Sequence, residues 1–207
     1  MGPVRGLLTL CLLLGVSALL ASGCGSTKKA EAAPPAPKVA CKDPGAWRKL
    51  ANRIHAPVYC PGWLPDPLCG VLGAQDNNIT SVSKDRSYLE SWVWQETGGA
   101  AGGELHVNLR AYPGVSKIPT CRTGGSDSRN VPCFASPNGT VSANGITATL
   151  YTVNQDADQW HYLLAWRRFR NLYTVSEHVA PPLTGEHVRR YLKQELQALQ
   201  LVQPAAA

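Results

Sequence analysis

The chain has 207 residues, a formal net charge of +6 and six tryptophans. Its lysines and arginines are scattered, without a dense basic run that carries interleaved aromatic residues, and this pattern argues against a nucleic-acid-binding domain. A chain of this length suits one domain with a core of its own, even when a leader and a linker take up its first residues.

The first residues predict a leader for export. Arg5 precedes an apolar run from Leu7 to Leu20, which is too short to span a bilayer, since a span takes roughly 20 residues. The segment Leu20-Ala21-Ser22-Gly23-Cys24 resembles the signal peptide and lipobox of bacterial lipoproteins. That resemblance implies cleavage before Cys24 and a diacylglyceryl group on its sulfur, which would anchor the chain on the extracytoplasmic face of the plasma membrane. The alternative is a plain secretory peptide cleaved near Gly23.

A tether is predicted after the leader. The segment holds Ser, Thr, Lys and Ala together with Pro34-Pro35-Ala36-Pro37, and it has no apolar periodicity. We therefore expect three parts: a signal peptide over 1–23, a lipidated Cys with a flexible Pro/Ala-rich tether over 24–40, and a single globular domain over 41–203.

The domain is predicted to begin with a helix and to continue as strands. Asp43 at the N-cap and Pro44 at the first helical position predict a helix that ends before Pro57. Residues then alternate with a period of two, as half-buried strands do. The expected strands are 88–96, 104–111, 141–143, 146–153, 160–168 and 172–179, with Asn144-Gly145 as a hairpin turn. Thr184 is expected to cap a final amphipathic helix whose apolar stripe runs from Val188 to Leu199.

This order predicts an α+β fold: a single antiparallel β-sheet with an N-terminal and a C-terminal helix packed on one face. The stretch from Gly139 to Leu201 carries Tyr162-Leu163-Leu164-Ala165-Trp166, then Leu172-Tyr173-Thr174-Val175-Ser176, then the amphipathic helix. It is similar to the closing half of PsbP-like domains found in several bacterial lipoproteins. The resemblance implies a binding or accessory module without catalysis of its own, and it assigns a role to no residue.

Export predicts that the cysteines of the domain form disulfides. Cys121 and Cys133 flank a polar loop and are expected to pair, and Cys60 and Cys69 flank a proline-rich turn and are plausible partners. Cys41 could then stay free, pair between molecules, or displace one partner of the Cys60–Cys69 pair. The sequence has no Cys-x-x-Cys motif and its histidines are dispersed, so neither a metal site nor a cofactor is expected.

Two groups of residues are candidate binding surfaces. The aromatic group is Trp92, Trp94, Trp160, Tyr162 and Trp166, which form either the core under the helices or a concave surface for an apolar or sugar-like ligand. The basic group is Arg167, Arg168 and Arg170, with the Arg189–Arg190 pair nearby, and it is either an anion-binding patch or a set of solubilising charges.

The sequence carries no hydrolase, metalloprotease, phosphate-loop or dinucleotide motif, and no catalytic residue is assigned. Hydrolysis would need a nucleophile beside a base, and His106, His161, His178 and His187 are the bases considered. We expect a non-catalytic binding or accessory domain of a cell-envelope lipoprotein. The alternatives are a cell-envelope enzyme or enzyme inhibitor, and a carrier of lipid or another apolar ligand. The expected partners are the membrane, through the lipid, and an envelope protein or cell-wall polymer, but not nucleic acid.

Overall fold

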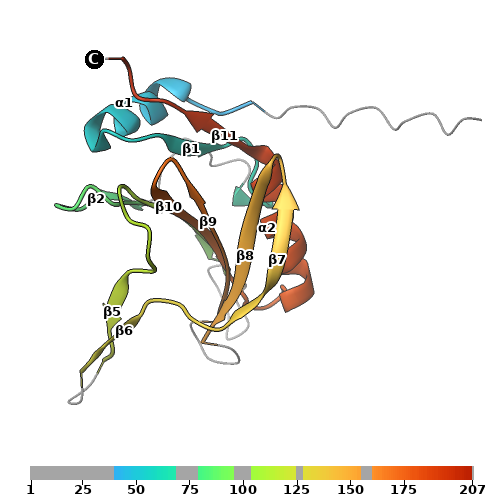
Figure 1. The fold of residues 1–207 in the computed structure, drawn as a ribbon. Helices are drawn as coiled ribbons and strands as arrows, with labels where there is room; N and C mark the ends of the chain where they lie inside the picture. Colours follow the sequence, from blue (N-terminus) through green and yellow to red (C-terminus); the bar gives the residue numbers. More distant parts are fainter. Residues whose placement is uncertain (1–39, 69–78, 96–103, 125–127, 155–159, 207) are drawn as a thin grey trace, which may run out of the picture. The chain divides into compact units, whose positions relative to one another are not determined.

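A computed structural model describes residues 40–68, 79–95, 104–124, 128–154 and 160–206 (Figure 1). The predicted leader, Cys24, nearly all of the tether and Cys69 lie outside these ranges. In chain order the elements are α1 (Pro44–Ile54), β1 (Val58–Pro61), β2 (Ile79–Val82), β3 (Tyr88–Gln95), β4 (Glu104–Tyr112), β5 (Thr120–Arg122), β6 (Asn130–Pro132), β7 (Pro137–Ala143), β8 (Ile146–Val153), β9 (His161–Arg168), β10 (Asn171–His178), α2 (Gly185–Ala198) and β11 (Leu199–Val202). Within the described ranges, neither helix has the length and apolar character that crossing a membrane requires.

The local signals for the helix starts and for one hairpin are confirmed. The Asp43 carboxylate accepts a hydrogen bond from the Ala46 amide at 3.0 Å, and Pro44 opens α1. Thr184 and His187 form a reciprocal capping box at the start of α2. Asn144 and Gly145 join β7 to β8 with φ angles of 51° and 69°, the left-handed conformation that a tight hairpin turn requires.

The fold is α+β with a large antiparallel sheet, but the prediction of a single sheet is wrong. Seven strands form the main sheet in the order β2-β3-β4-β10-β9-β8-β7, and the pairs β1–β11 and β5–β6 form two further sheets. Strand β11 follows α2 directly, since Leu199 is already extended, and it pairs with β1 from Val58↔Val202 to Pro61↔Leu199. Figure 1 shows α1 beside this pair and α2 against the strands of the main sheet.

The main sheet has two faces of different chemistry. Successive residues of a strand point to opposite faces, and the strand register shows which residues share one. One face, here called the core face, is apolar and packs into the main hydrophobic core with residues of α1, α2, β1 and β11; it includes Trp92, Val107, Leu109, Leu150, Leu164, Trp166, Tyr173 and Val175. The second face is more polar and includes Ser91, His106, Asn108, Ser176 and His178. A smaller apolar cluster of Phe134, Ala165 and Leu172 packs on part of that second face.

One predicted disulfide is present and the other is replaced. Cys121 is joined to Cys133, as expected, and this bond ties β5 to the end of β6. Cys60 is joined to Cys41 rather than to Cys69, with the two Cα atoms 5.6 Å apart. The structure thus has the alternative in which Cys41 displaces one partner of the Cys60–Cys69 pair, because β1 runs beside the chain that leads into α1 and so brings Cys60 next to Cys41. This bond fixes the start of the domain to β1.

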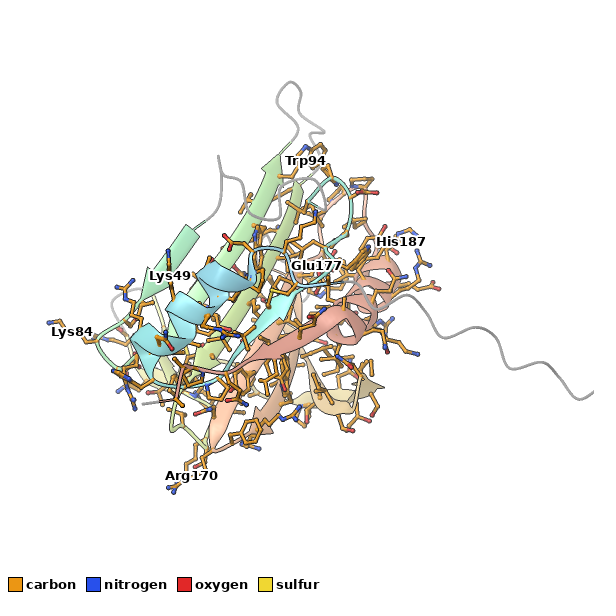
Figure 2. All side chains as sticks on the ribbon, turned by 90° about the horizontal axis from the view of Figure 1, so that it is seen from above. Lys49, Lys84, Trp94, Arg170, Glu177 and His187 are labelled. Carbon is orange, nitrogen blue, oxygen red and sulfur yellow. A yellow bond between two sulfur atoms is a disulfide. The ribbon has the colours of Figure 1, made fainter. Side chains whose placement is uncertain are left out.

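A pair of acidic residues lies inside the core. Glu177 of β10 and Glu195 of α2 have relative exposures of 0% and 1%, and Figure 2 shows Glu177 within the fold. Burial raises the pKa of both carboxyls, and the interaction with Glu195 raises the pKa of Glu177 further. Burial disfavours the charge on each carboxyl, and two ionised neighbours would also repel each other, so the folded state favours the protonated forms.

We expect this pair to make the protein less stable as the pH rises. Both pKa values are raised above the ordinary 4.5, so the folded state keeps protons that the unfolded chain releases. Their contribution is complete below about pH 4.5 and is lost progressively as the pH rises from there through the raised folded pKa values of about 8 for Glu195 and about 10 for Glu177. The free energy of unfolding should fall between about pH 5 and pH 8 by on the order of 1 kcal/mol or more.

Urea denaturation across this pH range measures the effect. The double variant Glu177→Gln/Glu195→Gln should flatten the fall and be more stable than the native protein at the alkaline end. Glu186→Gln, which changes an exposed carboxylate of the same helix, should leave the slope unchanged. A slope that persists in the double variant would show that other groups cause it.

Candidate functional site

Three histidines that are far apart in the sequence, His106, His178 and His161, occupy a row of neighbouring positions across β4, β10 and β9 on the second face of the main sheet, and we call them the histidine row. His161 of β9 pairs with His178 of β10, and the register Glu177↔Val107 places His178 opposite His106 of β4. The ring centroids are 4.9 Å apart for His161–His178, 5.5 Å for His106–His161 and 6.4 Å for His106–His178. The antiparallel pairing of three neighbouring strands therefore builds the row.

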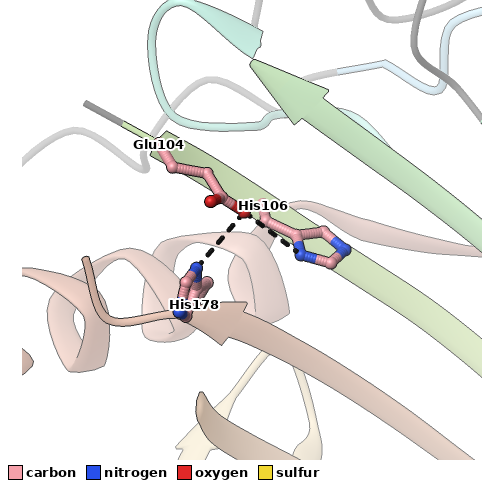
Figure 3. A group of neighbouring side chains, drawn as sticks. All are labelled: Glu104, His106 and His178. Carbon is pink, nitrogen blue, oxygen red and sulfur yellow. Dashed lines mark ion pairs between the residues drawn. The ribbon is translucent and has the colours of Figure 1, made fainter. Parts of the chain in front are cut away.

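Glu104 completes the cluster from the first position of β4. It lies two residues before His106 and therefore points to the same face. Its Oε1 atom is 3.3 Å from Nδ1 of His178 and 3.7 Å from Nδ1 of His106 (Figure 3). The side chains of Glu104 and His106 are 30% and 24% exposed, whereas that of His178 is 8% exposed. The cluster is thus anchored in the sheet and open to solvent on one side.

The neighbours of His106 determine which of its nitrogens carries a proton. Nε2 lies 3.1 Å from Asn108 Oδ1 and 3.1 Å from Ser91 Oγ. Because a carbonyl oxygen only accepts, the amide of Asn108 in this orientation requires a proton on Nε2. Burial lowers the pKa of His106 below its ordinary value of 6.5, against the opposing effect of the hydrogen bond that Nε2 donates to Asn108. The neutral ring then presents the lone pair of Nδ1 to Glu104.

This arrangement fits a divalent transition metal ion. One ligand atom each from Glu104, His106 and His178 lies within 4.8 Å of the others. A metal–nitrogen bond of about 2.0–2.1 Å places tetrahedral ligand atoms roughly 3.3 Å apart, close to the separations from Glu104. The hydrogen bond from Nε2 of His106 to Asn108 is the kind of second interaction that orients a ligating histidine. Two imidazoles and one carboxylate suit zinc, copper, nickel or iron.

The same residues also form a serine–histidine–acid chain. Ser91 Oγ lies 3.1 Å from His106 Nε2, and Glu104 Oε1 lies 3.7 Å from Nδ1, which is the order of groups in enzymes that activate a serine but too long at its second step for a hydrogen bond. Ser91 is only 1% exposed, however, and a base needs an unprotonated Nε2, which the contact with Asn108 opposes. The geometry therefore favours a metal over a serine nucleophile.

The aromatic candidates belong to the core rather than to an open surface. Trp92, Tyr162 and Trp166 are buried in the main hydrophobic core, and Trp94 and Trp160 are partly buried against it. Trp166 stacks on Tyr173, with the ring centroids 5.8 Å apart. The five rings therefore pack in or against the core, which is the first of the two alternatives.

The Arg189–Arg190 pair does not join the other basic candidates in one patch. Arg167, Arg168 and Arg170 are exposed at the turn between β9 and β10. Arg189 instead lies over the ring of Tyr162. Tyr162 is six residues before Arg168 on β9, so the two positions are about 20 Å apart. The Arg189–Arg190 pair is thus at the other end of the strand, because α2 begins where β10 ends.

The histidines were candidate bases by residue type, but nothing in the sequence indicated that three of them lie close together. They are separated by 55 and 17 residues, from His106 to His161 and from His161 to His178, and only the strand register brings them together. The expectation that no metal site exists rested on this dispersal. The alternating pattern of β4 was the available signal, since it places Glu104 and His106 on the polar side of the strand.

Comparisons with known proteins give no relative from which a role could be transferred. No family model, curated protein or solved structure matches the chain. The similarity to PsbP-like domains stays a prediction, and the site is interpreted from its own chemistry.

The proton on His106 can be located directly. At neutral pH, nitrogen-15 NMR should show a neutral ring with the proton on Nε2. Asn108→Asp places a carboxylate beside this N–H and should raise the pKa of His106 by about one unit or more. Asn138→Asp, on the exposed strand β7, is the matched control and should leave the titration of His106 unchanged. A proton on Nδ1 in the native protein would contradict the assigned tautomer.

Proposed function

We propose that the protein is a membrane-anchored, extracytoplasmic binding domain that holds a divalent transition metal ion between Glu104, His106 and His178. The observation that carries the proposal is the position of Glu104 Oε1, 3.3 Å and 3.7 Å from one nitrogen of each histidine. Without a cation, the lone pair of His106 Nδ1 faces the negative carboxylate of Glu104 with no proton between them. A metal ion would bind both groups. Zn²⁺ is the probe ion, and the role is non-catalytic.

The proposal includes the location of both helices on the core face. It is supported by Trp47 of α1, which contacts Tyr88 and Trp92, and by Arg189 of α2, which lies over Tyr162. All three of the contacted residues belong to the core face by register. The second face, with the histidine row, would then be the side of the sheet on which a ligand is bound.

The location of the protein rests on the first residues of the sequence. The lipobox-like segment that ends at Cys24 supports a lipid anchor in the plasma membrane, and the two disulfides support an oxidising compartment. An envelope protein or a cell-wall polymer remains the proposed macromolecular partner.

The second candidate function is hydrolysis with Ser91 as the nucleophile. It is favoured by the 3.1 Å contact of Ser91 Oγ with His106 and opposed by the burial of Ser91. The two candidates differ in their dependence on Ser91, which a metal site does not need and a hydrolase cannot lose. Cleavage of a short-chain aryl ester that is abolished by Ser91→Ala would establish the hydrolase.

We expect isothermal titration calorimetry to detect one Zn²⁺ per chain in the folded protein. Glu104→Gln and His178→Gln should each weaken binding at least about tenfold, because each removes a ligand while keeping a side chain of similar size. Ser91→Ala should change the affinity far less than either.

His55→Asn is the matched control, since it removes an exposed histidine at a left-handed position that asparagine tolerates. Circular dichroism establishes that each variant is folded. Zn²⁺ binding that is unchanged in both ligand variants would refute this site.

The anchor has its own test. The native chain should partition into detergent, and its mature form should begin at Cys24 and carry the mass of a diacylglyceryl group. Cys24→Ser should lose the added mass. A soluble mature protein that begins near residue 24 without lipid would support plain secretion and leave the metal site untouched.

A further inference from the structure

The turn between β9 and β10 has a backbone conformation that its residues do not favour. Phe169 and Arg170 connect the two strands with φ angles of 51° and 61°. Asn144 and Gly145 adopt nearly the same conformation between β7 and β8, and Asn-Gly is the preferred sequence for such a turn. A bulky aromatic residue rarely occupies the left-handed region, so Phe169 is held there at a cost in stability. This points to a role for these residues other than making the turn.

The same turn is exposed, aromatic and basic. Phe169 is 55% exposed and is the one exposed large hydrophobic residue in the described part of the chain. Arg167, Arg168 and Arg170 flank it in the sequence and are also exposed. Among the described residues, no carboxylate forms an ion pair with any of the three. We call the four residues from Arg167 to Arg170 the hairpin tip; in Figure 2, Arg170 projects away from the ribbon.

Contacts with neighbouring segments hold the hairpin tip in place. Arg167 Nε donates to the carbonyl of Ser116 at 2.7 Å, and Arg168 Nη1 donates to the hydroxyl of Tyr59 at 3.3 Å. The Arg168 guanidinium also lies 5.0 Å from the centre of the Phe169 ring. The guanidinium groups keep further N–H donors for an outside anion, and their fixed positions reduce the entropy lost on binding.

A second basic turn lies at the same end of the main sheet. The turn between β2 and β3 carries the exposed Lys84 and Arg86, and Arg86 donates to the carbonyl of Ile54. Tyr88 at the start of β3 and Tyr173 at the start of β10 both pair with Ala111 of β4, which lies between them. The starts of β3 and β10 are therefore two strand spacings apart, or about 10 Å. Asp85 is the acidic residue of this turn, and its carboxylate accepts hydrogen bonds from Ser87. The end of the sheet is therefore positively charged overall.

We propose that the hairpin tip docks on an anionic phospholipid surface, with Phe169 inserted among the headgroups and the arginines on the phosphates. Arginine pairs with phosphate oxygens in a bidentate manner, and cations near an anionic leaflet are attracted to it. A soluble anionic polymer would satisfy the arginines but would leave the aromatic ring in water, so the exposed Phe169 favours a bilayer. This docking is independent of metal binding, because the tip and the histidine row lie at opposite ends of β9.

The test uses the chain from residue 25 onward, without lipid and with both disulfides formed. The described core lies within the compact unit from Pro37 to Ala207, so this chain keeps every residue of that core. Sedimentation with vesicles of phosphatidylglycerol and phosphatidylcholine should show binding that weakens with salt, and vesicles of phosphatidylcholine alone should bind at least about tenfold less.

The double variant Phe169→Asn/Arg170→Gly separates docking from folding. It installs the favoured Asn-Gly turn, so its melting temperature should equal or exceed that of the native protein. Its binding to the anionic vesicles should fall at least about tenfold. Lys193→Ala, which removes an exposed charge from α2, is the control and should bind like the native protein.

Phe169→Asn alone distinguishes a bilayer from a soluble polyanion. It should weaken binding to anionic vesicles while leaving binding to polyphosphate unchanged. Native-like vesicle binding by the double variant, equal binding to neutral vesicles, or stronger binding to polyphosphate than to vesicles would each overturn the proposal.

Discussion

The pairing of β4 with β10 is the constraint on which the rest of the structure depends. It joins the β2–β3–β4 segment to the β7–β8–β9–β10 segment, and its register sets Glu177 opposite Val107. Glu177 consequently enters the core and His178 turns to the second face beside His106. A slip of one residue would exchange the two faces, so that a histidine entered the core and the carboxyl left it. The candidate metal site and the buried acid pair are therefore consequences of one register.

The sequence predicted those parts of the fold that local chemistry determines. Asp43 and Thr184 determine where helices begin, and Asn144-Gly145 determines a turn, because each acts within a few residues. The β1–β11 pair was missed because Val58 and Val202 lie at opposite ends of the domain. Four extended residues that follow a helical stripe have the same apolar character as another turn of helix, so periodicity could not separate β11 from α2.

The candidate site could not be predicted from the sequence for a related reason. A lone histidine on a strand is compatible with many roles, and only the pairing of three strands makes His106, His161 and His178 neighbours. The pairing of Cys41 with Cys60 was likewise left open, because the positions of cysteines along a chain do not fix the approach of β1 to the start of α1. In both cases the residue types are visible in the sequence, but their proximity depends on the tertiary structure, because the strands that bring them together are distant in sequence.

The two proposals use opposite ends of β9. His161 at its first position stacks on His178 of the candidate metal site, and Arg168 at its last position begins the turn that carries Phe169. A strand of this length holds the two ends about 20–25 Å apart. Residues 25–40 could span at most roughly 55 Å when extended, so a lipid at Cys24 would permit many orientations of the domain. Contact of the hairpin tip with the same membrane would select one of them, in which the end of the sheet that carries the candidate metal site is directed away from the lipid surface.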